Sequence, residues 1–149
     1  NWSGCHSVGW DISAPEYGDY EVLDNFQKHS YSWGVMLNTD GIRFVDEGED
    51  LCNHAYVKFG REIMKQPDRT AVQIFDQKTI PLLRDEYRIR QVTKFSGHTI
   101  AELAQGLDIN ESALTKTIDE FNAACALGEF NPSILDDLST RGLNPNKTN

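Results

Sequence analysis

Residues 33–66 read WGVMLNTDGIRFVDEGEDLCNHAYVKFGREIMKQ, and this stretch decides the fold. Large apolar side chains stand at every second position of residues 33–37. Residues 38–41 then form a turn sequence, in which Gly41 can adopt a positive φ. Residues 42–45 have the apolar character of a return strand. The pattern predicts a β-hairpin.

The second half of the stretch predicts an amphipathic helix. Asp50 is placed to cap its start, and Pro67 stops it after Gln66. Its apolar residues recur at helical spacing and form one stripe: Cys52, Ala55, Tyr56, Phe59 and Ile63. A helix N-terminus lowers the pKa of a thiol and could make Cys52 a nucleophile, but its place on the stripe favours a packed core thiol.

Shorter elements are predicted on both sides of this stretch. Residues 1–32 read as an irregular loop with a short strand near residues 7–12. Residues 71–75 and 91–95 predict strands, because both are short and rich in β-branched or aromatic side chains. Between them, residues 82–90 begin as a helical turn.

Two further helices are predicted in the second half of the chain. Thr99 and Glu102 have the spacing of a capping box, and a short helix with one apolar face follows. Asn110 caps the next helix, which continues to Gly128 as its stop signal. The elements together predict an α+β fold, a small hairpin or sheet packed against helices. We expect its core at residues 33–128, after the lead-in of residues 1–32 and before a linker over residues 129–149.

The composition of the chain excludes several classes of function. A chain of 149 residues is the usual size of one domain. Its net charge of −9 argues against binding of duplex nucleic acid, which requires Lys and Arg on the phosphates. No apolar run reaches the roughly 18 residues of a membrane span. The three cysteines are widely spaced and no signal peptide is visible, so we expect neither a zinc site nor disulfides, and a cytoplasmic location.

Two segments before the hairpin carry side chains suited to anion binding. His6 has a side chain that titrates near neutral pH and could hold a carboxylate or move a proton; the alternative is a loop residue without a role. Residues 28–31, Lys-His-Ser-Tyr, offer one cation and three hydrogen-bond donors to an anion, or are merely the solvated start of a strand.

Two charged stretches follow the predicted hairpin in the sequence. Residues 82–94 are locally basic and contain Arg88, which could bind a carboxylate through two of its guanidinium nitrogens or pair with neighbouring acids on the surface. Residues 46–50 are acidic but lack the spacing of a calcium loop, so we expect a charged corner and no metal site. Neither a G-x-G-x-x-G loop nor a P-loop occurs, which excludes nucleotide binding by those two motifs.

Five short motifs carry a resemblance when they are taken in order. They are GVMLN, TDG, RFVDE, TIAELAQGLDIN and LTKTIDEFN. In this order and spacing the chain resembles the capping domain of the fumarate reductase/succinate dehydrogenase flavoprotein superfamily. The segments WSGCHSVGWD, QKHSY and LLRDEYRIRQVTK are more particularly similar to flavin-dependent tricarballylate dehydrogenases.

The resemblance implies an enzyme whose cap is inserted into an FAD-binding domain. FAD would be bound by that other domain, and none is expected on this chain. The implied reaction oxidises the saturated carbon–carbon bond of a small polycarboxylate, such as tricarballylate to cis-aconitate. An electron-acceptor protein could be a further partner. By position, the residues implied to bind substrate are His6, Gln27, His29, Tyr31 and Arg88.

One departure from the family pattern concerns the proton shuttle. Fumarate reductases carry an arginine shortly after R-F-x-N-E, where this chain has Leu51 and Cys52. The resemblance therefore assigns no catalytic residue. Two alternatives stay open: a stand-alone module that binds a ligand or a protein without catalysis, and a reductase of the same superfamily that runs the reaction in the opposite direction.

Overall fold

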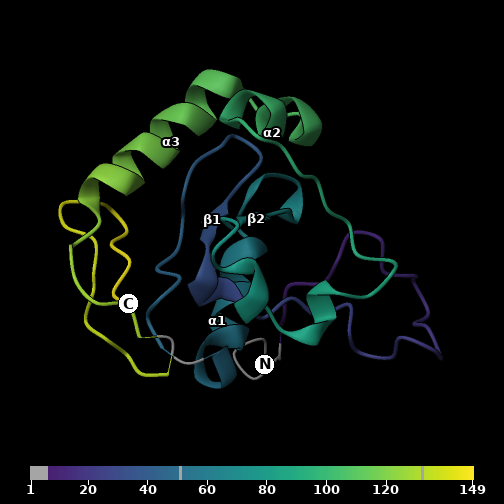
Figure 1. Cartoon of the computed structure of the whole chain (residues 1–149). Coiled ribbons are helices and arrows are strands. Elements are labelled where there is room, and N and C mark those ends of the chain that lie inside the picture. The colour runs from purple at the N-terminus through teal and green to yellow at the C-terminus, as the bar shows by residue number, and fades with distance from the viewer. Residues whose placement is uncertain (1–6, 51, 132) are drawn as a thin grey trace.

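The structure is a computed structural model that describes residues 7–50, 52–131 and 133–149. Its centre is a two-stranded antiparallel sheet of β1, Val35–Leu37, and β2, Val72–Ile74. Helix α1, Cys52–Ile63, lies on one side of the sheet, and helices α2, Ile100–Leu107, and α3, Glu111–Ala124, arch over the other (Figure 1). The chain is therefore a small α+β fold, as predicted.

Strand β1 is buried on both faces, and this explains the position of the three helices. Met36 packs against α1 in a cluster with Phe59, which is fully buried. Val35 and Leu37 point the opposite way and pack with Leu114 of α3 and with α2. Side chains alternate between the faces of a strand, so three consecutive apolar residues supply both cores.

The partner of β1 differs from the predicted hairpin. The turn forms as predicted, with Gly41 at a φ of 77° and the Asn38 side chain accepting the main-chain N–H groups of residues 40 and 42. Residues 42–45, however, contribute only an isolated bridge between Arg43 and Leu37, and β1 pairs instead with β2. The hairpin prediction is wrong here because the main-chain N–H of Met36 donates to the Glu47 carboxylate rather than to a returning strand.

A buried ion pair between Arg43 and Glu47 lies beside β1. The Glu47 carboxylate accepts hydrogen bonds from Nε of Arg43 at 3.1 Å and from Nη2 at 2.5 Å, and both side chains are almost fully buried. The guanidinium also donates to the carbonyls of Val45 and Pro145. Several donors thus compensate the cost of burying the carboxylate.

The short elements predicted at residues 7–12, 82–90 and 91–95 differ in the structure. The described residues contain four short 3₁₀ helices, at Tyr31–Trp33, Pro67–Arg69, Ile80–Leu82 and Asp85–Tyr87. The last two replace the predicted helical turn of residues 82–90. Residues 91–95 form no strand, since Thr93 directs its N–H to the Asp11 side chain. Near residues 7–12 a single bridge, Trp10 to Gln27, replaces the predicted strand.

Helix α3 ends earlier than predicted, and Gly128 is not its stop. The helix ends at Ala124 because Cys125 adopts an extended conformation and forms a bridge with Thr140. The carbonyl of Ala124 then accepts the N–H of Arg141. The N-terminal caps are confirmed: Thr99 accepts the N–H of Glu102, and the Asn110 side chain caps α3.

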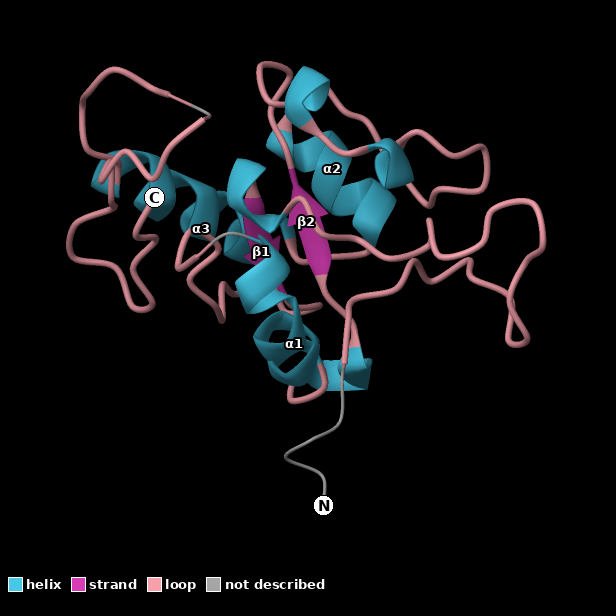
Figure 2. Cartoon of the chain, turned by 90° about the horizontal axis from the view of Figure 1, so that it is seen from below, coloured by secondary structure: helices cyan, strands magenta, loops and turns pink. Residues whose placement is uncertain are grey.

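The last ten residues, where sequence predicted a linker, pack against the centre of the molecule. Thr148 binds the Asp46 carboxylate, and the Asn149 side chain donates to the carbonyl of Gly48. Lys147 reaches further and donates to the carbonyls of Ser32 and Gly34. Figure 2 shows how much of the remaining chain is loop around this small regular centre. Among the described residues, no helix is long and apolar enough to cross a membrane.

Candidate functional site

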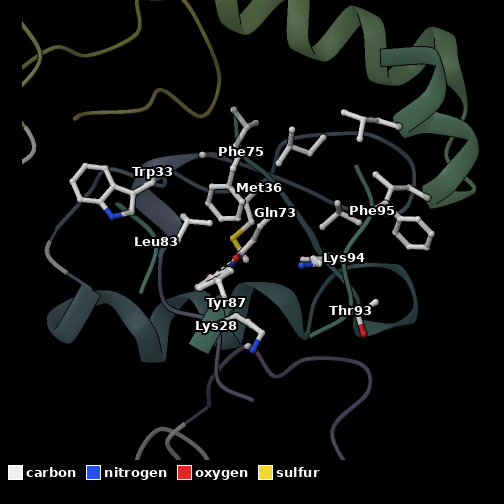
Figure 3. A pocket seen from close by; sticks show the side chains of 18 of the residues that line it. Lys28, Trp33, Met36, Gln73, Phe75, Leu83, Tyr87, Thr93, Lys94 and Phe95 are labelled. Carbon is white, nitrogen blue, oxygen red and sulfur yellow. Dashed lines mark hydrogen bonds between the residues drawn. The ribbon is translucent and has the colours of Figure 1, made fainter. Parts of the chain in front are cut away.

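An open cleft of about 1780 Å³ runs along β2. In Figure 3, Gln73 and Phe75 lie on one side of it and Thr93, Lys94 and Phe95 on the other. The remaining walls come from the 3₁₀ turns of residues 80–87 and from the lead-in near Lys28. The cleft is therefore built from segments that are far apart in sequence.

Most of the cleft wall is apolar. Trp33 and Met36 line it beside β1, Leu83 comes from the turn of residues 80–83, and Phe95 faces them from the opposite side. Phe95 is 55% exposed, so its ring is available to an occupant of the cleft. An apolar cleft with a few polar groups is the usual form of a ligand site.

The charge of the cleft is opposite to that of the whole chain. The chain has 14 Lys and Arg against 23 Asp and Glu. Among the described residues that line the cleft, the acidic ones are Asp11 and Asp76, and the basic ones are Lys28, Arg69, Arg88, Lys94 and Lys147. A local excess of positive charge attracts anions to a protein that repels them overall.

Three of these cations are used inside the protein. The Nζ atom of Lys28 donates to the carbonyls of Asn25 and Glu86, each at 3.0 Å. Lys147 donates to two carbonyls beside β1. Arg88 donates to carbonyls of the preceding turn and lies 3.2 Å from a carboxylate oxygen of Asp85. These groups shape the cleft but have few donors left for a ligand.

Two cations remain available. Within the described part of the chain, the side chains of Arg69 and Lys94 make neither an ion pair nor a hydrogen bond. Both are exposed and both line the cleft. Lys94 lies near the middle of the opening in Figure 3. The two side chains can therefore bind an anion without breaking an internal contact.

The Asp11 carboxylate fixes the wall that carries Lys94. Its oxygens accept the N–H of Thr93 at 3.0 Å and the Thr93 hydroxyl at 2.6 Å. They also accept the N–H and hydroxyl of Ser13, and Lys28 lies 3.7 Å away. Burial raises the pKa of the Asp11 carboxyl, but the hydrogen bonds from Thr93 and Ser13 outweigh it, so the pKa lies below its ordinary value.

Replacing Asp11 with asparagine is expected to destabilise the protein in a way that depends on pH. The lowered pKa means that the carboxylate stabilises the fold above the unfolded value of 3.8, and that this contribution is lost as the pH falls through the lower folded value. At about pH 7 the loss should be roughly 1–3 kcal/mol of unfolding free energy. Urea unfolding of both proteins from about pH 7 to about pH 3 tests this; a difference that stays constant in acid contradicts it.

The residues implied to bind substrate are not gathered in the cleft. His6 lies outside the described residues, as does Leu51, and the side chain of Cys52 is likewise not described. Of the four others, only Arg88 lines the cleft. Tyr31 instead stacks on Phe59 of α1, with 4.1 Å between ring centroids.

His29 lies in a polar group with Glu86, and neither residue lines the cleft. Its Nδ1 atom is 3.9 Å from Oε1 of Glu86, which accepts the main-chain N–H of His29. Burial lowers the pKa of His29, although the Glu86 carboxylate opposes this shift. The buried Nε2 atom has no hydrogen-bond partner among the described residues. The burial of His29 therefore disfavours the charged imidazolium.

Sequence reasoning missed several groups that form the cleft. Asp11 precedes Ser13 in an Asp-x-Ser pattern, the local signal of a side chain that accepts main-chain N–H groups. Tyr87 accepts the N–H of Ser30 and donates to the Gln73 side chain, and burial raises the pKa of its hydroxyl. No local pattern indicates these last contacts, because they join residues far apart in sequence.

Comparison of the chain with protein-family models and with curated proteins finds no match.

Proposed function

We propose that the chain is the substrate-capping part of a cytoplasmic FAD-dependent oxidoreductase of the fumarate reductase/succinate dehydrogenase superfamily, acting on a small polycarboxylate such as tricarballylate. The observation that carries the proposal is the reversed charge of the cleft. Arg69 and Lys94 offer cations to an anionic substrate in a chain whose net charge is −9. The five motifs of the sequence, in family order, support the same assignment.

The chain's own part in the reaction is to bind and orient the substrate. The Lys94 ammonium is a mobile point charge, whereas the Arg69 guanidinium can hold a carboxylate through two parallel hydrogen bonds. Two separate cations suit a substrate with more than one carboxylate. The apolar rings of Phe75 and Phe95 exclude water around the carbon chain, which strengthens both ion pairs.

The described residues that line the cleft do not fit FAD, the implied cofactor. The cleft offers no glycine-rich turn at a helix N-terminus to cradle a pyrophosphate; its described glycines are Gly9, Gly34, Gly60 and Gly97. In the proposal a separate FAD-binding domain therefore holds the flavin.

Addition of tricarballylate to the protein from the complete reading frame, without oxygen, is expected to bleach its flavin absorbance. The substrate would be oxidised to cis-aconitate while the flavin is reduced. Bound flavin that stays yellow with tricarballylate, or a protein that binds no flavin, contradicts the proposal. If cis-aconitate reoxidises the reduced flavin faster than tricarballylate reduces it, the protein is a reductase of the same superfamily.

The role of Lys94 has a matched control. Lys94→Gln should raise KM for tricarballylate roughly fivefold with little change in kcat, because a partly solvated ion pair contributes about 1 kcal/mol. Lys78→Gln removes an equal charge from an exposed lysine that does not line the cleft. Equal effects of both substitutions would mean that the overall charge, and not the cleft, attracts the substrate.

A further inference from the structure

The register of the sheet determines which main-chain groups of β2 are free to bind. Met36 lies opposite Gln73, and Val35 and Leu37 lie opposite Ile74 and Val72. The N–H of Met36 donates to Glu47 at 2.7 Å and so points away from β2. In an antiparallel pair, opposite residues either both exchange hydrogen bonds or both point outward. The N–H and carbonyl of Gln73 therefore point away from β1.

The outer edge of β2 is open. Ala71 and Phe75 flank β2, each two residues from Gln73, which is the spacing at which an extended chain repeats its orientation. Among the described residues, no hydrogen bond reaches the main-chain N–H or carbonyl of these three residues. All three residues line the cleft and are only partly exposed. Partly buried main-chain groups in this state favour any partner that can complete the ladder.

The inner edge of the sheet is closed in contrast. Met36 donates to Glu47, the Gly34 carbonyl accepts from Lys147, and the N–H of Asn38 donates to the carbonyl of Ile42. The chain thus satisfies one edge with its own groups and leaves the other facing a cleft.

The opposite wall of the cleft does not fill this edge. Thr93 is held by the Asp11 side chain through two hydrogen bonds, and the Ser13 hydroxyl shares its one proton between the Asp11 carboxylate and the carbonyl of Gln91. These contacts fix residues 91–93 to the lead-in. The space between the wall and β2 is open to a further segment of polypeptide.

We propose that the outer edge of β2 binds an extended acidic peptide, which adds a third strand to the sheet. Its main chain pairs with Ala71, Gln73 and Phe75, which makes binding tolerant of sequence. The acidic character follows from Arg69, which precedes the strand, and Lys94, which faces it across the cleft; neither has a partner among the described residues. Alternate apolar side chains of the peptide contact Phe95 and Leu83. This inference does not depend on the flavin chemistry proposed above.

Amide hydrogen exchange tests the proposal, with the strand as its own control. In the free protein, the amides of Val72 and Ile74 should be protected by β1, while that of Gln73 exchanges rapidly. A blocked octapeptide of alternating valine and glutamate should slow exchange at Gln73 and Phe75 by roughly tenfold or more at saturation. Val72 and Ile74 should change little. A peptide that leaves the exchange of Gln73 unaltered overturns the proposal.

Peptide and protein variants separate main-chain pairing from charge. The same peptide with N-methylated alternate amides should lose binding, and a valine–lysine peptide should bind at least roughly fivefold more weakly.

Ala71→Pro removes one outward N–H; Thr70 already has the extended φ of −117° and ψ of 143° that a following proline requires. Lys94→Glu should weaken the glutamate peptide and strengthen the lysine peptide without touching the strand. Equal binding of all peptides contradicts the proposal.

A second copy of the chain is the other occupant that the experiment detects. If Gln73 is already protected in the free protein and its protection rises with protein concentration, the edge pairs with another copy. Protection that does not depend on concentration would mean that the chain closes the edge itself. Either result overturns peptide binding, and neither bears on flavin reduction by tricarballylate, so failure of the two proposals can be told apart.

Discussion

Glu47→Ala is expected to lower the free energy of unfolding by about 3–5 kcal/mol, the usual cost of removing one partner of a buried ion pair. Its carboxylate accepts the N–H of Met36 and two donors of Arg43, and its side chain is fully buried. The substitution leaves a buried guanidinium without its anion and removes the group that closes the inner edge of β1. Urea unfolding followed by circular dichroism measures the loss.

Two further variants separate the ion pair from simple loss of volume. Glu62→Ala removes a carboxylate whose partner Lys65 is exposed, so it should cost no more than about 1 kcal/mol. Arg43→Met combined with Glu47→Leu removes both charges and should be far less harmful than Glu47→Ala alone. If the double variant loses as much unfolding free energy as the Arg43→Met and Glu47→Leu single variants lose together, the pair does not act as a unit.

Phe59→Ala should cost about 3–5 kcal/mol of unfolding free energy, which combines lost burial with the cavity that remains. Phe59 is 0% exposed and stacks on Tyr31, with Met36 and Ala55 in the same cluster. The ring therefore joins α1 to the sheet and to the end of the lead-in. Thermal and urea unfolding check the magnitude.

Phe130 provides the matched control for this substitution. It is 56% exposed and contacts Trp33 edge to face, so Phe130→Ala should cost about 1 kcal/mol or less. A further consequence distinguishes the two sites: only Phe59→Ala should change the near-ultraviolet circular dichroism of Tyr31. Similar losses at both positions would mean that α1 is loosely packed.

The helices could be predicted from sequence because their signals are local. Asn110 accepts the N–H of Ala113, and Thr99 that of Glu102, within one turn of the residue that supplies the cap. The stripe that ends at Ile63 likewise depends only on the spacing of apolar residues. Such signals need no knowledge of what lies elsewhere in the chain.

The strand partner and the end of α3 could not be predicted in this way. A turn at Gly41 favours a hairpin locally, yet the Glu47 carboxylate binds the N–H that a return strand would have used. The end of α3 is set by Thr140 and Arg141, which lie beyond a long loop. In both cases a distant group competes with a local pattern, and only packing decides the outcome.

The sequence indicates residue types that could bind an anion, but it does not indicate how they are arranged. The basic character of residues 82–94 is visible in the sequence, and Lys94 does reach the cleft. By residue type Lys28 is equally suited to bind an anion, but its ammonium donates to two carbonyls. Sequence identifies which side chains carry charge, whereas the fold determines which charges remain available.

The packing of the last residues has a consequence for how the chain folds. Lys147 binds the carbonyl of Gly34 across 113 positions, and Thr148 binds Asp46 across 102. Contacts between such distant residues slow folding, because a long loop must close before they form. The contact of Lys147 that completes the closed edge of the sheet therefore forms late, and during synthesis only after Lys147 has left the ribosome.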